Sequence, residues 1–189
     1  MFKFIVVSVL AITMLSCAGT KTENSDGSPT IEKLKSDIEM IDDSLKIYYQ
    51  QVMNNQIESV PNDAIQKTID AHLTFYHYYP KDEFSAECLD KVHQLYIQQK
   101  LYVKSVEIAD TLLAEFPKYK GKKDVLYSVA TTYDFMLNDA ANAKKYYEKI
   151  LAMPKLDKET RENISTRIKL MGMSLDEMIE FQNKKNSKK

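Results

Sequence analysis

The chain has 189 residues, 44% of them apolar, which suits one domain with short appendages. Its 26 basic and 27 acidic side chains leave a formal net charge of −1. This near-balance excludes a global basic field of the kind that attracts nucleic acid. Glycine (4) and proline (5) are scarce, so the composition favours helices.

The first 16 residues are typical of a secretory signal peptide. Lys3 supplies a positive start, and an apolar run of twelve residues follows from Phe4 to Leu15. That run is too short for a permanent membrane-spanning helix, which needs about 20 residues. The segment therefore predicts an exported protein.

The end of this segment, Met14-Leu15-Ser16-Cys17, resembles the bacterial lipobox. In that motif the cysteine becomes the lipidated first residue of the mature chain. The resemblance implies that lipid on Cys17 anchors the protein to a membrane. The residue after it is Ala18 and not Asp, which favours the outer membrane, facing the periplasm. The alternative is an ordinary cleaved signal peptide with an incidental cysteine.

The stretch from Cys17 to residue 30 has no large apolar side chain after the cysteine, and it is predicted to be a disordered tether. The only other cysteine is Cys88, which has no disulfide partner if Cys17 carries lipid. Cys88 lies on an apolar helical face with Leu89 and Val92, so we expect a buried, unreactive thiol.

A long N-terminal helix is predicted over residues 31–57. Two interpretations of its apolar stripe are open: the helix covers one end of the domain, or residues 31–52 form a coiled coil with a second copy of the chain. The stripe has heptad spacing and consists of Ile31, Leu34, Ile38, Ile41, Leu45, Tyr48 and Val52.

Three prolines, Pro80, Pro117 and Pro154, are separated by 37 residues each, and each follows a large apolar residue. Tyr96 and Tyr133 keep the same interval. A period of this length predicts a helix pair that stacks on copies of itself, here over residues 58–173. Residues 174–189 are predicted to form a short capping helix and a basic tail, because Ser174 and Glu177 have capping-box spacing.

This pattern resembles the tetratricopeptide repeat, although the chain has no tryptophan and its period is longer than the family's. The resemblance implies an all-α fold, a short α-solenoid of antiparallel helix pairs. The long period and the aromatic–proline endings resemble repeat lipoproteins of bacterial outer-membrane assembly. The matching positions are Tyr96 and Tyr133, the small residues Ser105 and Ala143, and the closing pairs Tyr79-Pro80 and Phe116-Pro117.

By repeat position, the first helices of the pairs would share an inner groove with one aromatic residue, Tyr127. Such a polar, somewhat acidic surface suits an extended or helical peptide that is held by hydrogen bonds and an aromatic anchor. A merely solvated face is the alternative. The other groove residues are expected to be Asp90, Gln94, Gln98, Asp124, Thr131 and Asp134.

No catalytic, metal or cofactor motif stands out. His72 and His77 are five residues apart, so they point to different sides of a helix. Glycine occurs only at positions 19, 27, 121 and 172, which leaves no phosphate-binding loop. A G-x-S-x-G elbow is also missing, and Cys88 has no evident activating base. The sequence thus predicts no enzyme, no cofactor and no metal site.

The predicted function is a membrane-anchored periplasmic scaffold for protein–protein contacts, with envelope assembly as its expected process. Its expected partners are other envelope proteins, which would bind in the groove, and the membrane, through the N-terminal lipid. The alternative function is a structural oligomer, a homo-oligomer joined through residues 31–52 with the repeats as spacers.

Overall fold

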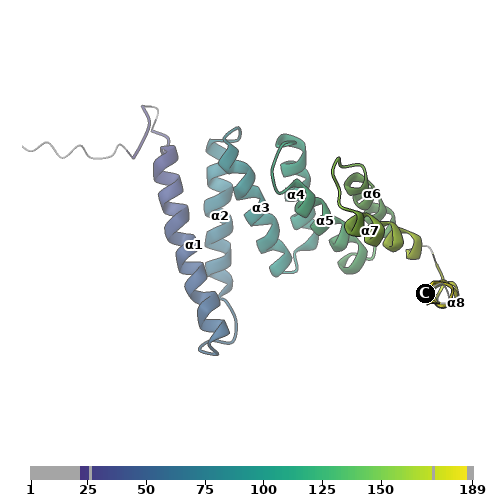
Figure 1. Ribbon diagram of the computed structural model, residues 1–189. Helices are drawn as coiled ribbons and strands as arrows, with labels where there is room; N and C mark the ends of the chain where they lie inside the picture. Colours follow the sequence, from purple (N-terminus) through teal and green to yellow (C-terminus); the bar gives the residue numbers. More distant parts are fainter. Residues whose placement is uncertain (1–21, 26, 172, 187–189) are drawn as a thin grey trace, which may run out of the picture.

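The computed structural model describes residues 22–25, 27–171 and 173–186, and helices make up nearly all of their regular structure (Figure 1). The predicted all-α class is confirmed for these ranges. The predicted helix 31–57 ends earlier, at Met53. The helices are α1 (Ile31–Met53), α2 (Asn62–Tyr78), α3 (Glu83–Gln98), α4 (Tyr102–Glu115), α5 (Lys122–Thr131) with a π-helical continuation η1 (Thr132–Met136), α6 (Ala140–Leu151), α7 (Lys158–Leu170) and α8 (Leu175–Asn186).

Polar side chains cap the N-termini of several of these helices by accepting a hydrogen bond from a backbone N–H group that has no partner within the helix. Asp82 accepts from the Phe84 N–H at 2.8 Å. At α8 the predicted capping box forms: the Ser174 N–H donates to Glu177 Oε2 at 2.7 Å, and the Glu177 N–H donates to Ser174 Oγ at 3.3 Å.

The odd-numbered helices lie side by side in one layer. Lys91 of α3 pairs with Asp42 of α1 at 3.5 Å. Further along the row, a 2.8 Å hydrogen bond joins His93 Nε2 of α3 to Ser128 Oγ of α5. These contacts bring together helices that are separated in sequence by a whole helix (Figure 1).

The even-numbered helices form the second layer. The Tyr76 hydroxyl of α2 donates to Glu115 Oε1 of α4 at 2.8 Å, and the Tyr146 hydroxyl of α6 donates to Asp110 of α4. The helices therefore pack as adjacent antiparallel pairs in a row, with side-chain bonds that run along each layer.

Three residues of the heptad stripe of α1 are buried within the chain, and the other four are half-buried. Leu34 and Ile38 pack with Phe75 and Cys88, and Leu45 packs against α2 and α3. The stripe is therefore covered by the chain's own helices. The expected burial of Cys88 is confirmed, since its side chain is fully buried, and this burial raises the pKa of its thiol to about 12.

The turns at Pro80 and Pro117 share one backbone geometry. Tyr79 has φ −130° and ψ 58°, and Phe116 has φ −120° and ψ 64°. The carbonyl of each accepts from the N–H three residues later, on Asp82 and Tyr119. The third turn differs, because α6 is followed by Ala152 in a helical conformation. The sequence period is therefore a structural period at the first two turns.

The π-helical turn η1 holds one extra residue. Lys100 and Asn138, which follow α3 and η1, both have positive φ, of 60° and 51°, and they lie 38 residues apart. A π-helix accommodates such an insertion within a helix. The proline interval hides it, because the stretch from Asn138 to Pro154 is one residue shorter than the stretch from Lys100 to Pro117.

The end of the predicted tether is ordered against α2. The Tyr79 hydroxyl donates to the Pro29 carbonyl at 2.7 Å, and Asn24 Nδ2 donates to the Tyr79 hydroxyl at 3.0 Å. A β-bridge joins Glu23 to Pro29. The prediction of disorder up to residue 30 is therefore wrong for this part, because Tyr79 offers a hydroxyl to an otherwise polar segment. Residues 17–21 lie outside the described residues.

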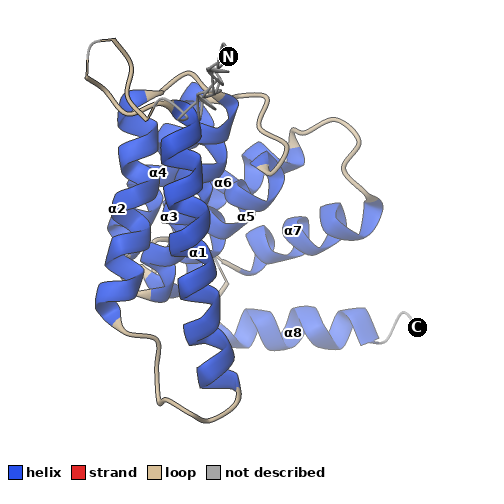
Figure 2. Cartoon of the chain, turned by 90° about the vertical axis from the view of Figure 1, so that its left-hand side faces the viewer, coloured by secondary structure: helices blue, strands red, loops and turns tan. Residues whose placement is uncertain are grey.

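Helix α8 lies apart from the row, beyond α7 (Figures 1 and 2). It packs against no other described helix over more than a few residues. The expectation that this helix caps the domain is therefore not met in the described ranges. Instead, α7 closes the row through Ile164, which is only 2% exposed.

We predict that deletion of residues 174–189 changes the melting temperature by less than about 2 °C, because little apolar area is lost. As a contrast, Ile164→Ala should cost about 2–5 kcal/mol and lower the melting temperature by several degrees. Thermal denaturation followed by circular dichroism measures both. A drop of more than about 5 °C on deletion would restore the capping role.

Candidate functional site

Six of the seven predicted groove residues lie on the exposed surface of the odd-numbered layer, here called the odd-helix face and formed by α3, α5 and α7. Gln94, Gln98, Asp124 and Tyr127 are exposed there. Two further predicted residues, Asp90 and Thr131, are half-buried.

On α3, the polar side chains of this face are tied to their neighbours. Asp90 accepts from Gln94 Nε2 at 3.1 Å and from the Tyr119 hydroxyl at 2.9 Å. Gln98 accepts from the hydroxyl of Tyr49 on α1. The α3 side of the face is therefore held in place by hydrogen bonds, and Gln94 keeps exposed donor and acceptor capacity.

Between α5 and α7 the face contains a cavity of about 220 Å³. Tyr127 is 48% exposed at its edge, and its ring makes an edge contact with Tyr147, with the centroids 6.1 Å apart. Buried Ile150 and Ile164 contribute apolar surface. The polar lining residues are Lys123, Asp124, Thr160 and Asn163.

One predicted groove residue is wrongly placed by the sequence argument. Asp134 is only 9% exposed, and it accepts two hydrogen bonds from the guanidinium of Arg167 on α7. The Tyr147 hydroxyl donates to the same carboxylate at 3.2 Å. Asp134 is buried because Tyr147 of α6 and Arg167 of α7 cover it. Its hydrogen bonds therefore join η1 to both helices. Asp134 and Arg167 are 33 residues apart, and no pattern in the sequence indicates that they pair.

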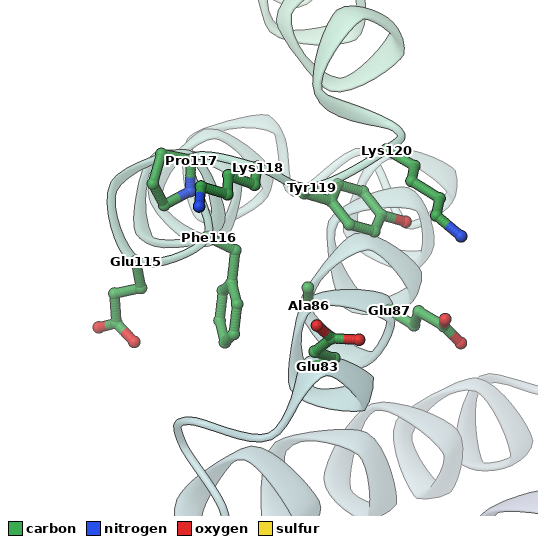
Figure 3. Close-up of a pocket in the computed structure, with 9 residues that line it drawn as sticks. All are labelled: Glu83, Ala86, Glu87, Glu115, Phe116, Pro117, Lys118, Tyr119 and Lys120. Carbon is green, nitrogen blue, oxygen red and sulfur yellow. The ribbon is translucent and has the colours of Figure 1, made fainter.

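A second cavity, of about 340 Å³, was missed by the sequence argument. It lies between the start of α3 and the turn that joins α4 to α5 (Figure 3). Phe116 and Pro117 line it, together with the small Ala86. The repeat pattern marks Phe116-Pro117 as a helix ending, but it does not reveal that Ala86 leaves space beside the ring.

His93 is a buried polar link between three helices. It is 1% exposed and lies 2.9 Å from the Ser105 carbonyl of α4 through Nδ1 and 2.8 Å from Ser128 Oγ of α5 through Nε2. Burial lowers the pKa of its imidazole. The hydrogen bonds offset the cost of burying this histidine.

The Ser128–His93 pair has the distance of a nucleophile and a base. However, Ser128 lies inside α5, where backbone N–H groups bond along the helix and offer no oxyanion site. Over the described residues, no group of three His, Cys, Asp or Glu side chains is arranged to hold a metal ion. The Ser128–His93 pair by itself is therefore not a complete catalytic arrangement.

Cys17, the predicted lipidation site, lies outside the described residues. None of the described helices combines the length and apolar character that a membrane span requires. Comparisons with protein-family models and with curated proteins gave no match.

We predict that acidification destabilises the fold through His93. Its folded pKa is lowered, so the unfolded chain binds protons more readily, from about pH 6.5 downward. The contribution of neutral His93 to the free energy of unfolding is complete above about pH 6.5. It is lost as the pH falls from there through the lowered pKa of the folded state.

Thermal denaturation between about pH 8 and pH 5 measures this loss. His93→Gln should reduce the pH dependence. The matched control is His77→Gln, which changes an exposed histidine of α2 and should leave the slope unchanged. An unaltered slope in His93→Gln would show that His93 is not responsible.

Proposed function

We propose that this protein is an exported bacterial lipoprotein whose tetratricopeptide-like α-solenoid binds other envelope proteins at its odd-helix face. The alternation of the helices between two layers and the matched turns at Tyr79 and Phe116 support the solenoid. Lipid on Cys17 would hold the domain at the outer membrane, facing the periplasm, where it would serve as a scaffold in envelope assembly.

The observation that carries this proposal is Tyr127 at the edge of the cavity between α5 and α7. An aromatic residue that is 48% exposed, next to a cavity and polar side chains, has the features of an anchor for a bound peptide. Tyrosine suits this role because it offers a large rigid surface and a polar tip.

The ordered end of the tether also supports anchoring close to a membrane. Asn24 and Pro29 are fixed to Tyr79, so only the residues between Cys17 and Thr22 separate the lipid site from the domain. The five steps along the chain from Cys17 to Thr22 span at most about 18 Å. The domain would therefore sit near the bilayer, with its α1 end closest to the anchor.

The structure weakens the argument for the alternative function, a structural oligomer that forms through residues 31–52. The heptad stripe that suggested it packs on α2 and α3, with Leu34, Ile38 and Leu45 all buried. Size-exclusion chromatography with light scattering on the full chain in detergent checks this directly. A stable oligomer that is disrupted by substitutions on the exposed side of α1, such as Ile47→Gln, would return this function to consideration.

We predict that Tyr127→Ala and Gln94→Ala each weaken partner capture by about tenfold, because removing a hot-spot side chain costs about 1–2 kcal/mol or more. The measurement is cross-linking in the native envelope followed by quantification of the captured chains. Val103→Ala, at an exposed residue on α4, is the control. Undiminished capture by both groove variants would exclude the odd-helix face.

We predict that Cys17→Ala moves the protein out of the membrane fraction, because it removes the acyl chains that anchor the chain stably. Fractionation and mass spectrometry of the N-terminal peptide measure the change. Continued membrane association, together with an unmodified Cys17 in the wild-type protein, would refute lipidation.

A further inference from the structure

The cavity beside Phe116 has an apolar wall and carboxylates at its opening. Phe116, Pro117 and Ala86 give the apolar surface. Figure 3 shows the Glu83 and Glu115 carboxylates on either side of the open edge of the Phe116 ring. This combination matches a ligand group with an apolar stem and a positive head.

These carboxylates are not neutralised by the chain's own cations. No described basic side chain forms an ion pair with Glu83, Glu87 or Glu115. Lys118 and Lys120 also line the cavity, but Figure 3 shows the ammonium of Lys120 directed away from the Phe116 ring. Glu115 accepts a hydrogen bond from the Tyr76 hydroxyl at 2.8 Å, but no described cation pairs with it or with Glu83, so the opening keeps negative charge beside the aromatic ring.

Beside the preceding turn, a cation of the chain itself lies over aromatic rings. Lys35 of α1 lies with its Nζ 4.9 Å from the centre of the Phe84 ring and 3.9 Å from Asp82 Oδ1. Lys35 is the fifth residue of α1, and Glu87 is the fifth residue of α3. At the first turn the chain supplies its own cation over aromatic rings, whereas at the second turn the corresponding helix position carries a carboxylate.

We infer that the cavity beside Phe116 binds a lysine or arginine side chain of an extended partner segment. The aliphatic stem would lie on Phe116 and Ala86, and the charged head would bond to Glu83 and Glu115. Glu83 and Glu87 continue along one side of α3 into Asp90 and Gln94, since these positions are three or four residues apart. The inference thus rests on the proposed function and gives the partner's chemistry: a basic segment that crosses the odd-helix face.

The test is a ¹H–¹⁵N NMR titration of the full chain in detergent with N-acetyl-arginine methylamide. Its matched neutral probe is N-acetyl-citrulline methylamide, which has nearly the same shape and no charge. We expect the arginine probe to shift the signals of residues 83–87 and 115–120 and to bind about tenfold more tightly than the citrulline probe. Equal binding of the two probes, or shifts elsewhere only, would overturn the inference.

Two variants locate the binding. Glu83→Gln combined with Glu115→Gln should weaken the arginine probe about tenfold. The control pair, Glu39→Gln with Glu107→Gln, removes the same charge from exposed positions on α1 and α4 and should have little effect. Ala86→Leu should block the probe by filling the cavity. An equal loss in the control pair would show non-specific attraction and would also overturn the inference.

Partner capture separates this inference from the proposed function. If Tyr127→Ala reduces capture and the Glu83/Glu115 pair does not, the scaffold function stands and the inference is wrong. If the Glu83/Glu115 pair reduces capture and Tyr127→Ala does not, the inference stands and the site moves away from the α5–α7 cavity. Loss in both variants supports both proposals.

Discussion

The fold depends on burial that one helix pair cannot achieve alone. Leu89 and Val92 of α3, and Val129 of α5, are fully buried, although each lies on a helix whose own partner covers only part of its surface. The next pair in the row covers the rest, so apolar area is removed from water along the whole stack. This constraint explains why α1 buries Leu34, Ile38 and Leu45 against its neighbours and why α7 must cover α6.

Buried polar bonds set how the stacked pairs align, a role that apolar burial cannot fill because it is non-directional. His93 fixes α3 against α4 and α5, and the Asp134–Arg167 pair fixes η1 against α7. A buried carboxylate or imidazole without its partner would be costly, so these contacts favour one alignment. The outer surface of the odd-numbered layer is then left with exposed polar side chains and Tyr127, and this is the face at which we propose that partner segments bind.

Much of the fold follows from patterns that the sequence displays, such as the apolar spacing of α1, the recurring prolines and the capping box at Ser174. Three features had no such pattern. The extra residue of η1 is compensated before Pro154, so the period conceals it. Asp134 and Arg167 meet only through packing between distant helices. The cavity beside Phe116 depends on the volume of Ala86, and spacing carries no information about empty space. The exposure of Tyr127 could be inferred from its position in the repeat.

Hydrogen exchange on the full chain with Leu126→Ala tests most directly whether neighbouring pairs stabilise one another. Leu126 is 2% exposed in α5, within the central part of the row. Our account predicts that protection falls most in α5, strongly in adjacent α4 and α6, and least in α1, because coupling passes between neighbours. A loss confined to α5, with unchanged protection in α4 and α6, would contradict it.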